Sequence, residues 1–328
     1  MSTLTMAKAL NAGLRAAMER DPKVVLIGED IGRLGGVFRI TDGLQKDFGE
    51  HRVIDAPLAE SGIVGAAVGL AMRGYRPVVE IQFDGFVYPA FDQIVSQVAK
   101  THRRTEGYVR LPMVIRIPYG GGIGAVEHHS ESPEAYFAHT AGLRVLTPSD
   151  PQSSYLTIQQ AIACEDPVVY FEPKRRYWEK GEVDESLDAL DPEQAPEAWR
   201  ARVVRPGDDV TVVCYGPMVR TCLEAADASE DVSLDVIDLQ SLSPLDLETV
   251  VSSVERTGRL VIVHEASANL GLGAEIAARV GERCFYSLEA PILRVTGYDI
   301  PYPPSRLEEH FLPDLDRVLD AVDRAMDH

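Results

Sequence analysis

The 328-residue sequence has no long uninterrupted apolar run and only four cysteines. Its first 22 residues carry polar or charged side chains every few positions, which excludes a secretory signal and a membrane span there. The cysteines form no CxxC pair and lie in or near apolar segments, as is typical of buried thiols in a reducing compartment; they are Cys164, Cys214, Cys222 and Cys284. We therefore expect a cytoplasmic protein.

Positive charge is also scarce. Lys and Arg total 32 against 51 Asp and Glu, so the formal net charge is −19. A charge of this sign repels nucleic acid and anionic membrane surfaces, and neither is expected as a partner. An acidic surface most often serves solubility, although it could also receive a basic protein module.

Several signatures of catalysis and ligand binding are missing. There is no HExxH zinc motif, GxSxG elbow, GxxxxGK[ST] loop or EF-hand loop. The glycine-rich stretch 120–124 resembles a phosphate cradle only weakly, and a mobile loop that delivers a histidine is the better interpretation. His128 and His129 follow it as an adjacent pair that does not share one helix face, which disfavours a metal site.

What the sequence does contain is a regular alternation of apolar strands and helices. Helical spacing of apolar residues predicts helices over 5–20, 61–74, 91–103 and 153–164. Short apolar runs between them predict strands over 24–28, 76–83, 113–118 and 167–173. This order indicates an α/β fold with a largely parallel sheet flanked by helices.

An acidic, proline-bearing stretch without a sustained apolar period then predicts a linker over 181–202. The alternation restarts beyond it, with strands expected over 209–216, 232–242, 259–266 and 292–297, and helices over 218–229, 245–258, 272–284 and 315–326. We predict a first domain over 1–180 and a smaller second α/β domain over 203–328.

Two local features could carry chemistry. Glu60 begins a glycine-rich predicted helix, either as a partner for the helix dipole or as a buried proton carrier with a raised pKa. Phe83, Phe86, Tyr88 and Phe91 cluster where a strand ends. Most of such a cluster is expected to be core, yet an aromatic ring at a strand end can also stack on a heterocycle. His264 and Glu265 are interpreted as a structural or interface feature.

A set of longer motifs runs along the whole chain in a fixed order. It comprises GEDIG, PLAESGIVGAAVGLAMRGYRPVVEIQF, YPAFDQI, HHSESPEAYFAHTAGLRV, PVVYFEPK, DLQSLSPLD and TGRLVIVHEA. Together these motifs closely resemble the β subunit of the thiamine-diphosphate-dependent 2-oxo acid dehydrogenase E1 component. HSESPEAYFAH and FEPKRRYW resemble the branched-chain enzymes most, with the pyruvate enzymes as the nearest competitors.

The resemblance implies an N-terminal thiamine pyrimidine-binding domain and a C-terminal transketolase-type domain, assembled with an E1 α subunit into an α2β2 heterotetramer. The chain lacks the GDG…N signature that holds Mg²⁺ and diphosphate. The α subunit is therefore expected to supply that half of the site. The C-terminal domain is expected to dock the subunit-binding domain of the E2 acyltransferase, whose lipoyl domain accepts the acyl group.

The resemblance also implies roles for individual residues. Glu60 matches the glutamate that hydrogen-bonds N1′ of the aminopyrimidine, and Phe86 falls where the family often has a tyrosine stacked on that ring. Leu58 and Gln82 would line the same pocket. His129 matches the active-site histidine, which would donate a proton as the acyl group passes to the lipoyl arm, whereas His128 falls where the family varies.

Some relatives hold a structural K⁺ through main-chain carbonyls in the segment that matches Ala161, Cys164 and Asp166. The resemblance therefore implies a candidate K⁺ site there.

Three alternatives to a branched-chain E1 β subunit stay open. The chain could belong to a pyruvate or acetoin dehydrogenase, it could be a non-catalytic assembly subunit, or it could be a single-chain transketolase-like enzyme. The missing diphosphate motif disfavours the last of these.

Overall fold

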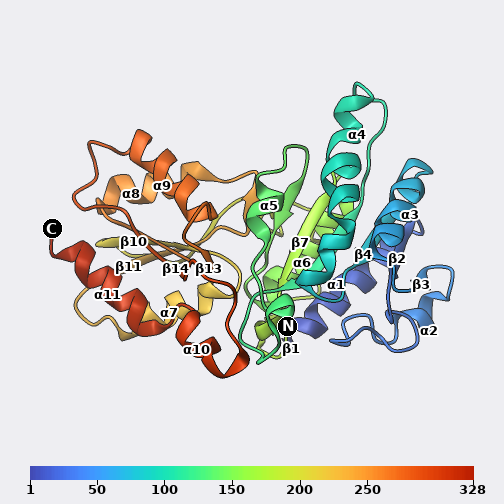
Figure 1. The fold of residues 1–328 in the computed structure, drawn as a ribbon, viewed down its shortest axis with the longest axis horizontal. Helices are drawn as coiled ribbons and strands as arrows, with labels where there is room; N and C mark the ends of the chain where they lie inside the picture. Colours follow the sequence, from blue (N-terminus) through green and yellow to red (C-terminus); the bar gives the residue numbers. More distant parts are fainter.

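The computed structural model describes residues 1–328 and shows two lobes side by side, each built on its own sheet (Figure 1). In spatial order, the first sheet contains β12 (Ser241–Ser243), β6 (Arg144–Leu146), β7 (Val168–Pro173), β5 (Val114–Tyr119), β4 (Arg76–Glu80), β2 (Val24–Gly28) and β3 (Val53–Asp55). The second contains β14 (Leu293–Gly297), β13 (Leu260–Ser267), β10 (Val210–Cys214), β11 (Leu234–Asp238) and β9 (Arg202–Arg205). Within these two sheets only β12 and β9 run antiparallel to their neighbours, which confirms the predicted α/β class.

Helices cover both faces of the first sheet. On one face α1 (Met6–Arg20) and α6 (Pro151–Ala163) pack together, so closely that a Cβ on Gly13 would lie 2.5 Å from a methyl carbon of Ile158. The other face carries α3 (Glu60–Met72) and one continuous helical stretch, a π-helical segment (Gln93–Val98) that leads into α4 (Ala99–Arg104). The short helices α2 (Leu44–Phe48) and α5 (Glu134–Ala138) lie in the connections.

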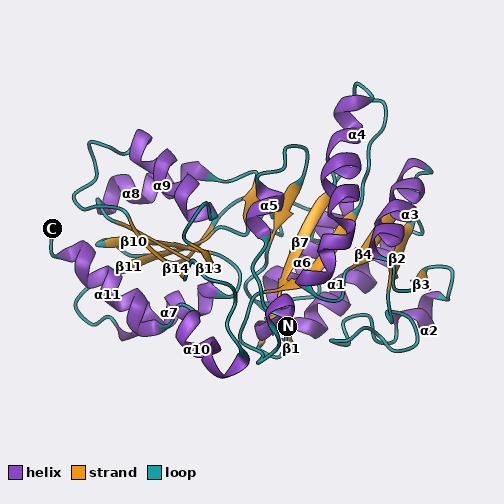
Figure 2. Cartoon of the chain, viewed as in Figure 1, coloured by secondary structure: helices purple, strands orange, loops and turns teal.

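The second sheet is also enclosed by helices on both sides (Figure 2). One side carries α8 (Leu247–Thr257) and α9 (Leu272–Arg283), and the other carries α7 (Met218–Ala228) and α11 (Leu315–Met326). The one-turn helix α10 (Glu308–Phe311) precedes α11. Helix α11 begins and ends where its apolar spacing predicts, because Asp314 caps it by accepting a hydrogen bond from the Arg317 amide. No helix in the chain is long and apolar enough to cross a membrane.

The two lobes share one apolar core. Its largest cluster of buried residues includes Ile115 and Phe171 from the first sheet together with Ile237 and Ile262 from the second.

The prediction of a single strand over 232–242 was wrong. The chain turns at Gln240, whose φ is +51°, so that β11 stays in the second sheet while β12 crosses to pair with β6.

The segment predicted as a linker lies along the first lobe. Its first residues form β8 (Lys180–Val183), which pairs antiparallel with β1 (Ser2–Thr5). Farther on, the Gln160 side chain on α6 donates to the carbonyl oxygens of Ala189 and Pro196, at 2.9 and 3.0 Å. The stretch has no helical or strand period because it is fastened by individual hydrogen bonds and small buried alanines.

A buried ion network crosses three neighbouring strands of the first sheet. Arg116 on β5 donates to Glu80 on β4 at 2.7 Å and to both carboxylate oxygens of Glu172 on β7 at 2.7 and 3.0 Å. Tyr177 donates to Glu172 at 2.6 Å. Burial raises the pKa of Glu80, so its ionised form depends on the guanidinium beside it.

Replacing Arg116 by Met should therefore leave two buried carboxylates without their cation. We expect Arg116→Met to lower the free energy of unfolding by about 3–5 kcal/mol. The matched control is Arg220→Met, because Arg220 is exposed and pairs only with Glu224 one turn along α7; its change should stay below about 0.5 kcal/mol. Urea unfolding of the two purified variants measures both, and equal losses would contradict this account.

Candidate active site

Glu60 is the first residue of α3 and lies at the carboxyl end of the first sheet. Its side chain is buried, and none of the side-chain hydrogen bonds or ion pairs of the chain involves it. Glu29 and Asp30 follow β2 nearby. Burial raises the pKa of Glu29, and repulsion from Asp30 and Glu60 raises it further. Carboxylates this close together repel one another. A basic ligand that shares a proton with them, or carries positive charge, would relieve that repulsion.

Gln82 joins this cluster from the strand next to β2. Its amide nitrogen lies 3.4 Å from the carbonyl oxygen of Glu29 and 3.5 Å from a carboxylate oxygen of Asp30. The ends of β2 and β4 thus bring Gln82 to Glu29 and Asp30, and the connection from β3 to α3 brings Glu60 near Glu29, at the edge where parallel α/β sheets bind ligands. Leu58, two residues before Glu60, is 71% exposed.

His129 lies against the aromatic cluster that follows β4. Its ring stacks on Phe83 with 4.0 Å between centroids and meets Phe86 edge-on at 5.0 Å. The approach is close because Gly85 has no side chain: a Cβ there would overlap the carbonyl oxygen of His128. His128 itself is exposed. The structure therefore brings His129 and Phe86 together, along with Phe83 from the aromatic cluster that the sequence showed at the end of the strand.

A buried ion pair lies directly behind this aromatic cluster. Lys174 donates to one oxygen of Asp84 at 2.9 Å, and the other oxygen accepts from the main-chain amide of Glu131 at 2.9 Å. Burial raises the pKa of Asp84 to about 6, and the Lys174 charge offsets part of that rise, so the carboxylate is ionised at neutral pH. Sequence analysis did not single out either residue, because their partners are distant in the chain.

Glu134 opens α5 and faces the second lobe. Its Oε1 accepts a hydrogen bond from the Tyr215 hydroxyl at 2.7 Å, while its buried Oε2 has no partner. Burial is the main reason that its pKa rises to about 8, so it is largely protonated at neutral pH. Farther into the second lobe, burial lowers the pKa of His264 to about 4, and its ring accepts from the Gly273 amide. The prediction that His264 is a structural or interface feature stays a prediction.

The carbonyls considered for K⁺ lie at the C-terminal end of α6. Arg76 donates there to the carbonyl oxygens of Ile162, Ala163 and Cys164, at 3.1 to 3.2 Å. A guanidinium thus already places positive charge at the end of this helix. These contacts give no support for a potassium site at Ala161, Cys164 and Asp166, which stays a prediction. No group of three or more acidic, histidine or cysteine side chains forms a metal site either.

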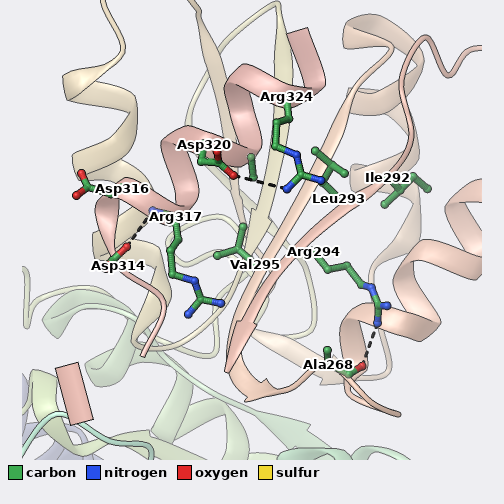
Figure 3. Close-up of a pocket in the computed structure, with 11 residues that line it drawn as sticks. Ala268, Ile292, Leu293, Arg294, Val295, Asp314, Asp316, Arg317, Asp320 and Arg324 are labelled. Atoms are coloured by element: carbon green, nitrogen blue, oxygen red, sulfur yellow. Dashed lines mark hydrogen bonds and ion pairs between the residues drawn. The ribbon is translucent and has the colours of Figure 1, made fainter. Parts of the chain in front are cut away.

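A separate cavity of about 580 Å³ lies in the second lobe, between β14 and α11 (Figure 3). Charged side chains of both signs line it. Arg324 lies 3.6 Å from Asp320, and Arg294 donates to the carbonyl of Ala268 at 3.0 Å. None of the predicted site residues reaches it, so the candidate active site remains the strand-end cluster of the first lobe.

The two helix-covered sheets, with Glu60 at the strand ends of the first, are those of an α/β protein of the transketolase type. Residues 2–179 match the family model of the transketolase pyrimidine-binding domain, and residues 200–318 match that of the transketolase C-terminal domain. More particularly, the chain belongs to the family of E1 β subunits of the 2-oxo acid dehydrogenases, as the following relatives show.

Three curated relatives show how extensive this similarity is. The pyruvate dehydrogenase E1 component subunit beta of Leifsonia xyli subsp. xyli is 58% identical, over 99% of this chain and 96% of its own length. The 3-methyl-2-oxobutanoate dehydrogenase subunit beta of Mycobacterium tuberculosis is 55% identical, over 99% and 92%. The 2-oxoisovalerate dehydrogenase subunit beta of Pseudomonas aeruginosa is 46% identical, over 100% and 96%.

A solved structure shows the same fold at lower identity. It is titled a split gene transketolase, inactive beta4 tetramer, and its TM-score is 0.78 at 24% identity, with 99% of this chain and 98% of that chain covered. This likeness speaks for the fold alone.

The pKa of Glu134 leads to a prediction about stability and pH. Because its folded-state pKa of about 8 lies above the ordinary 4.5, its contribution to stability is full below about pH 4.5 and is lost as the pH rises toward 8. Glu134→Gln removes this dependence. The melting temperature of the variant minus that of the wild type should rise between pH 5 and 8. The exposed Glu127→Gln is the control and should show no trend; a flat difference for Glu134→Gln would contradict the prediction.

Proposed function

We propose that this chain is the pyrimidine-side subunit of a thiamine-diphosphate-dependent E1 that decarboxylates branched-chain 2-oxo acids and passes the acyl group to the lipoyl arm of E2. The observation that carries the proposal is Glu60, a residue only 8% exposed at the ligand-binding edge of a parallel sheet, whose carboxylate makes no hydrogen bond or ion pair within the chain. A carboxylate at this edge that is not engaged by the protein is available to a ligand, and here the ligand would be the cofactor.

The residues at this edge fit an aminopyrimidine ring. Thiamine diphosphate, when bound, supplies a carbon nucleophile and an electron sink. Glu60 would hold a proton at N1′ of the ring, and the negative charges of Glu29 and Asp30 nearby would favour a protonated, positively charged ring. Phe86 would offer its face for stacking, while Leu58 and Gln82 would line the pocket.

His129 would act as the proton donor during acyl transfer. Its Nδ1 lies 2.9 Å from the carbonyl oxygen of His128, which favours a proton on Nδ1 and leaves Nε2 to exchange protons with a substrate. Stacking on Phe83 fixes the orientation of the ring. The adjacent His128 has no such support and is exposed.

The site would be completed by an E1 α subunit, in an α2β2 assembly in which that subunit holds Mg²⁺ and the diphosphate. The outer face of α3 supports this part of the proposal. Gly62, Gly65 and Gly69 lie exposed along it, with open space at Gly65 and Gly69 where a Cβ would point, and Met72 is 51% exposed. An uncovered apolar face on the helix that begins with Glu60 suits a close-packed partner.

The net charge of −19 suits a basic docking module of an E2 acyltransferase, and the reduced cysteines suit the cytoplasm.

Two classes of 2-oxo acid are candidates for the substrate. The motifs HSESPEAYFAH and FEPKRRYW and the 55% identical 3-methyl-2-oxobutanoate dehydrogenase subunit favour branched-chain acids. Pyruvate is the second candidate, because the 58% identical relative is a pyruvate dehydrogenase subunit.

The test is co-expression with an E1 α candidate, followed by thiamine-diphosphate-dependent decarboxylation of 3-methyl-2-oxobutanoate and of pyruvate. We expect activity only with the partner and faster turnover of the branched acid. Glu60→Gln should lower the rate by about 100-fold or more, because a positioned proton carrier contributes on that order. His129→Ala should lower acyl transfer to a lipoyl domain by about 100-fold.

The matched controls are the exposed neighbours, Ser61→Ala for Glu60 and His128→Ala for His129, and both should stay within about threefold of the wild type. If Glu60→Gln and His129→Ala assemble normally and keep full activity, the chain is an assembly subunit without catalytic residues. Faster turnover of pyruvate would instead move the substrate assignment to the second candidate.

A further inference from the structure

The glycine loop that precedes His129 is bound by carboxylates of the second lobe. The amides of Gly122 and Gly124 donate to the two oxygens of Glu308, at 2.8 and 2.9 Å. The amide of Gly121 donates to Glu265 at 3.2 Å. Both acids are buried. A glycine loop whose amides point at one anion is the geometry of an anion-binding nest, and here the anion is a side chain of the same protein.

The glycines themselves are required by this arrangement. Gly122 and Gly124 have φ of +89° and +69°, a region that favours glycine. A Cβ on Gly122 would lie 2.6 Å from the Arg175 side chain, and one on Gly121 would overlap the Tyr302 hydroxyl. The run of glycines, interpreted from sequence as a mobile loop, is therefore fitted to a fixed set of neighbours.

Glu308 is held in place by its own partner. It opens α10, is 6% exposed, and its Oε1 also accepts a hydrogen bond from the Tyr302 hydroxyl at 2.7 Å. Tyr302 packs with Phe311 and Leu312 in a small apolar cluster of the second lobe. The carboxylate of Glu308 is thus oriented by contacts within the second lobe, independently of the glycine loop that it binds.

The loop is closed at its other end, next to His129. The Gly120 amide donates to the carbonyl of Glu131 at 2.9 Å, which joins the two ends of residues 120–131. The Glu131 amide donates to Asp84, the partner of Lys174. His129 lies inside this closed loop, between the contact with Glu308 and the contact with Asp84.

We propose that Glu308 is a positioning residue for His129: it fixes the glycine loop from the second lobe and so holds the imidazole against Phe83. This inference rests on the role given to His129 above. It means that the orientation of a group on the first lobe depends on a carboxylate of the second lobe that touches no reacting atom.

The test compares Glu308→Gln with Glu309→Gln in the assembled enzyme. Glu309 is the next residue on α10 and is exposed, so it is the matched control. In Glu308→Gln one of the two oxygens that accept from the glycine amides is replaced by an NH2 group, which cannot accept, so one of the two hydrogen bonds is lost. Hydrogen exchange of residues 120–131 should quicken about tenfold or more in Glu308→Gln, without a matching change in the strands. Acyl transfer to a lipoyl domain should fall about tenfold, while the KM for the 2-oxo acid stays within about twofold.

Tyr302→Phe is the second variant, because it removes the hydroxyl that donates to Glu308 and leaves both carboxylate oxygens of Glu308 in place. It should shift loop exchange and acyl transfer in the same direction by a smaller factor, and it decides the matter if Glu308→Gln does not assemble. Unchanged exchange of residues 120–131, or exchange that quickens equally throughout the first lobe, would overturn the proposal.

His129→Ala in the same assay separates this proposal from the proposed function. Full acyl transfer by His129→Ala would show that the histidine has no catalytic role. Loss of transfer in His129→Ala but not in Glu308→Gln, although the loop has loosened, would show that Glu308 does not position the histidine.

Discussion

Main-chain amides at the junction of the two lobes are held by acceptors of the protein itself, because an amide left without a partner is costly. In this chain the amides of Gly121, Gly122 and Gly124 donate to two carboxylates, Glu265 and Glu308, of the second lobe. The arrangement fixes where residues 120–131 run. It therefore fixes where His129 can lie. It also explains the glycines at 120 and 121, where a Cβ would collide with Glu265 and Tyr302 of the second lobe.

The same dependence appears elsewhere along the junction of the lobes. Arg202, at the start of the second lobe, donates to Asp150, which caps α6 in the first lobe, and to the buried Asp238 in the second. Strand β12 leaves the second lobe to complete the first sheet. Since one apolar core also runs through both lobes, the two units behave structurally as one body, and the edge of the first that carries the proposed site is shaped by residues of the second.

Sequence patterns predicted the elements whose signals are local. Helix α11 and the fully buried strands β2 and β7 lie where apolar periodicity placed them. The division of 232–242 into two strands escaped prediction, because both halves are apolar and the turn at Gln240 is set by tertiary contacts. The short elements β6 and α5 carry too few residues to show a period.

The residues of the candidate site could be predicted from the sequence, whereas the contacts that hold them in place could not. Glu60, Phe86 and His129 could be named from the resemblance, and an aromatic cluster containing Phe83 was visible in the sequence. The contacts that organise the site could not be predicted: Gly122 and Gly124 lie 186 and 184 positions from Glu308, and no local pattern encodes such a pair. The buried partnership of Asp84 with Lys174, 90 positions apart, was hidden for the same reason.

The central claim is that this chain carries only the pyrimidine half of a shared thiamine site, with Glu60 as its essential contact. Calorimetric titration of thiamine diphosphate and Mg²⁺ into the chain alone, into the assembly with an E1 α subunit, and into the Glu60→Gln assembly tests it most directly. The account predicts binding by the wild-type assembly, none detectable by the chain alone, and affinity weakened about tenfold or more by Glu60→Gln. Equally tight binding by the chain alone, or by the Glu60→Gln assembly, would contradict it.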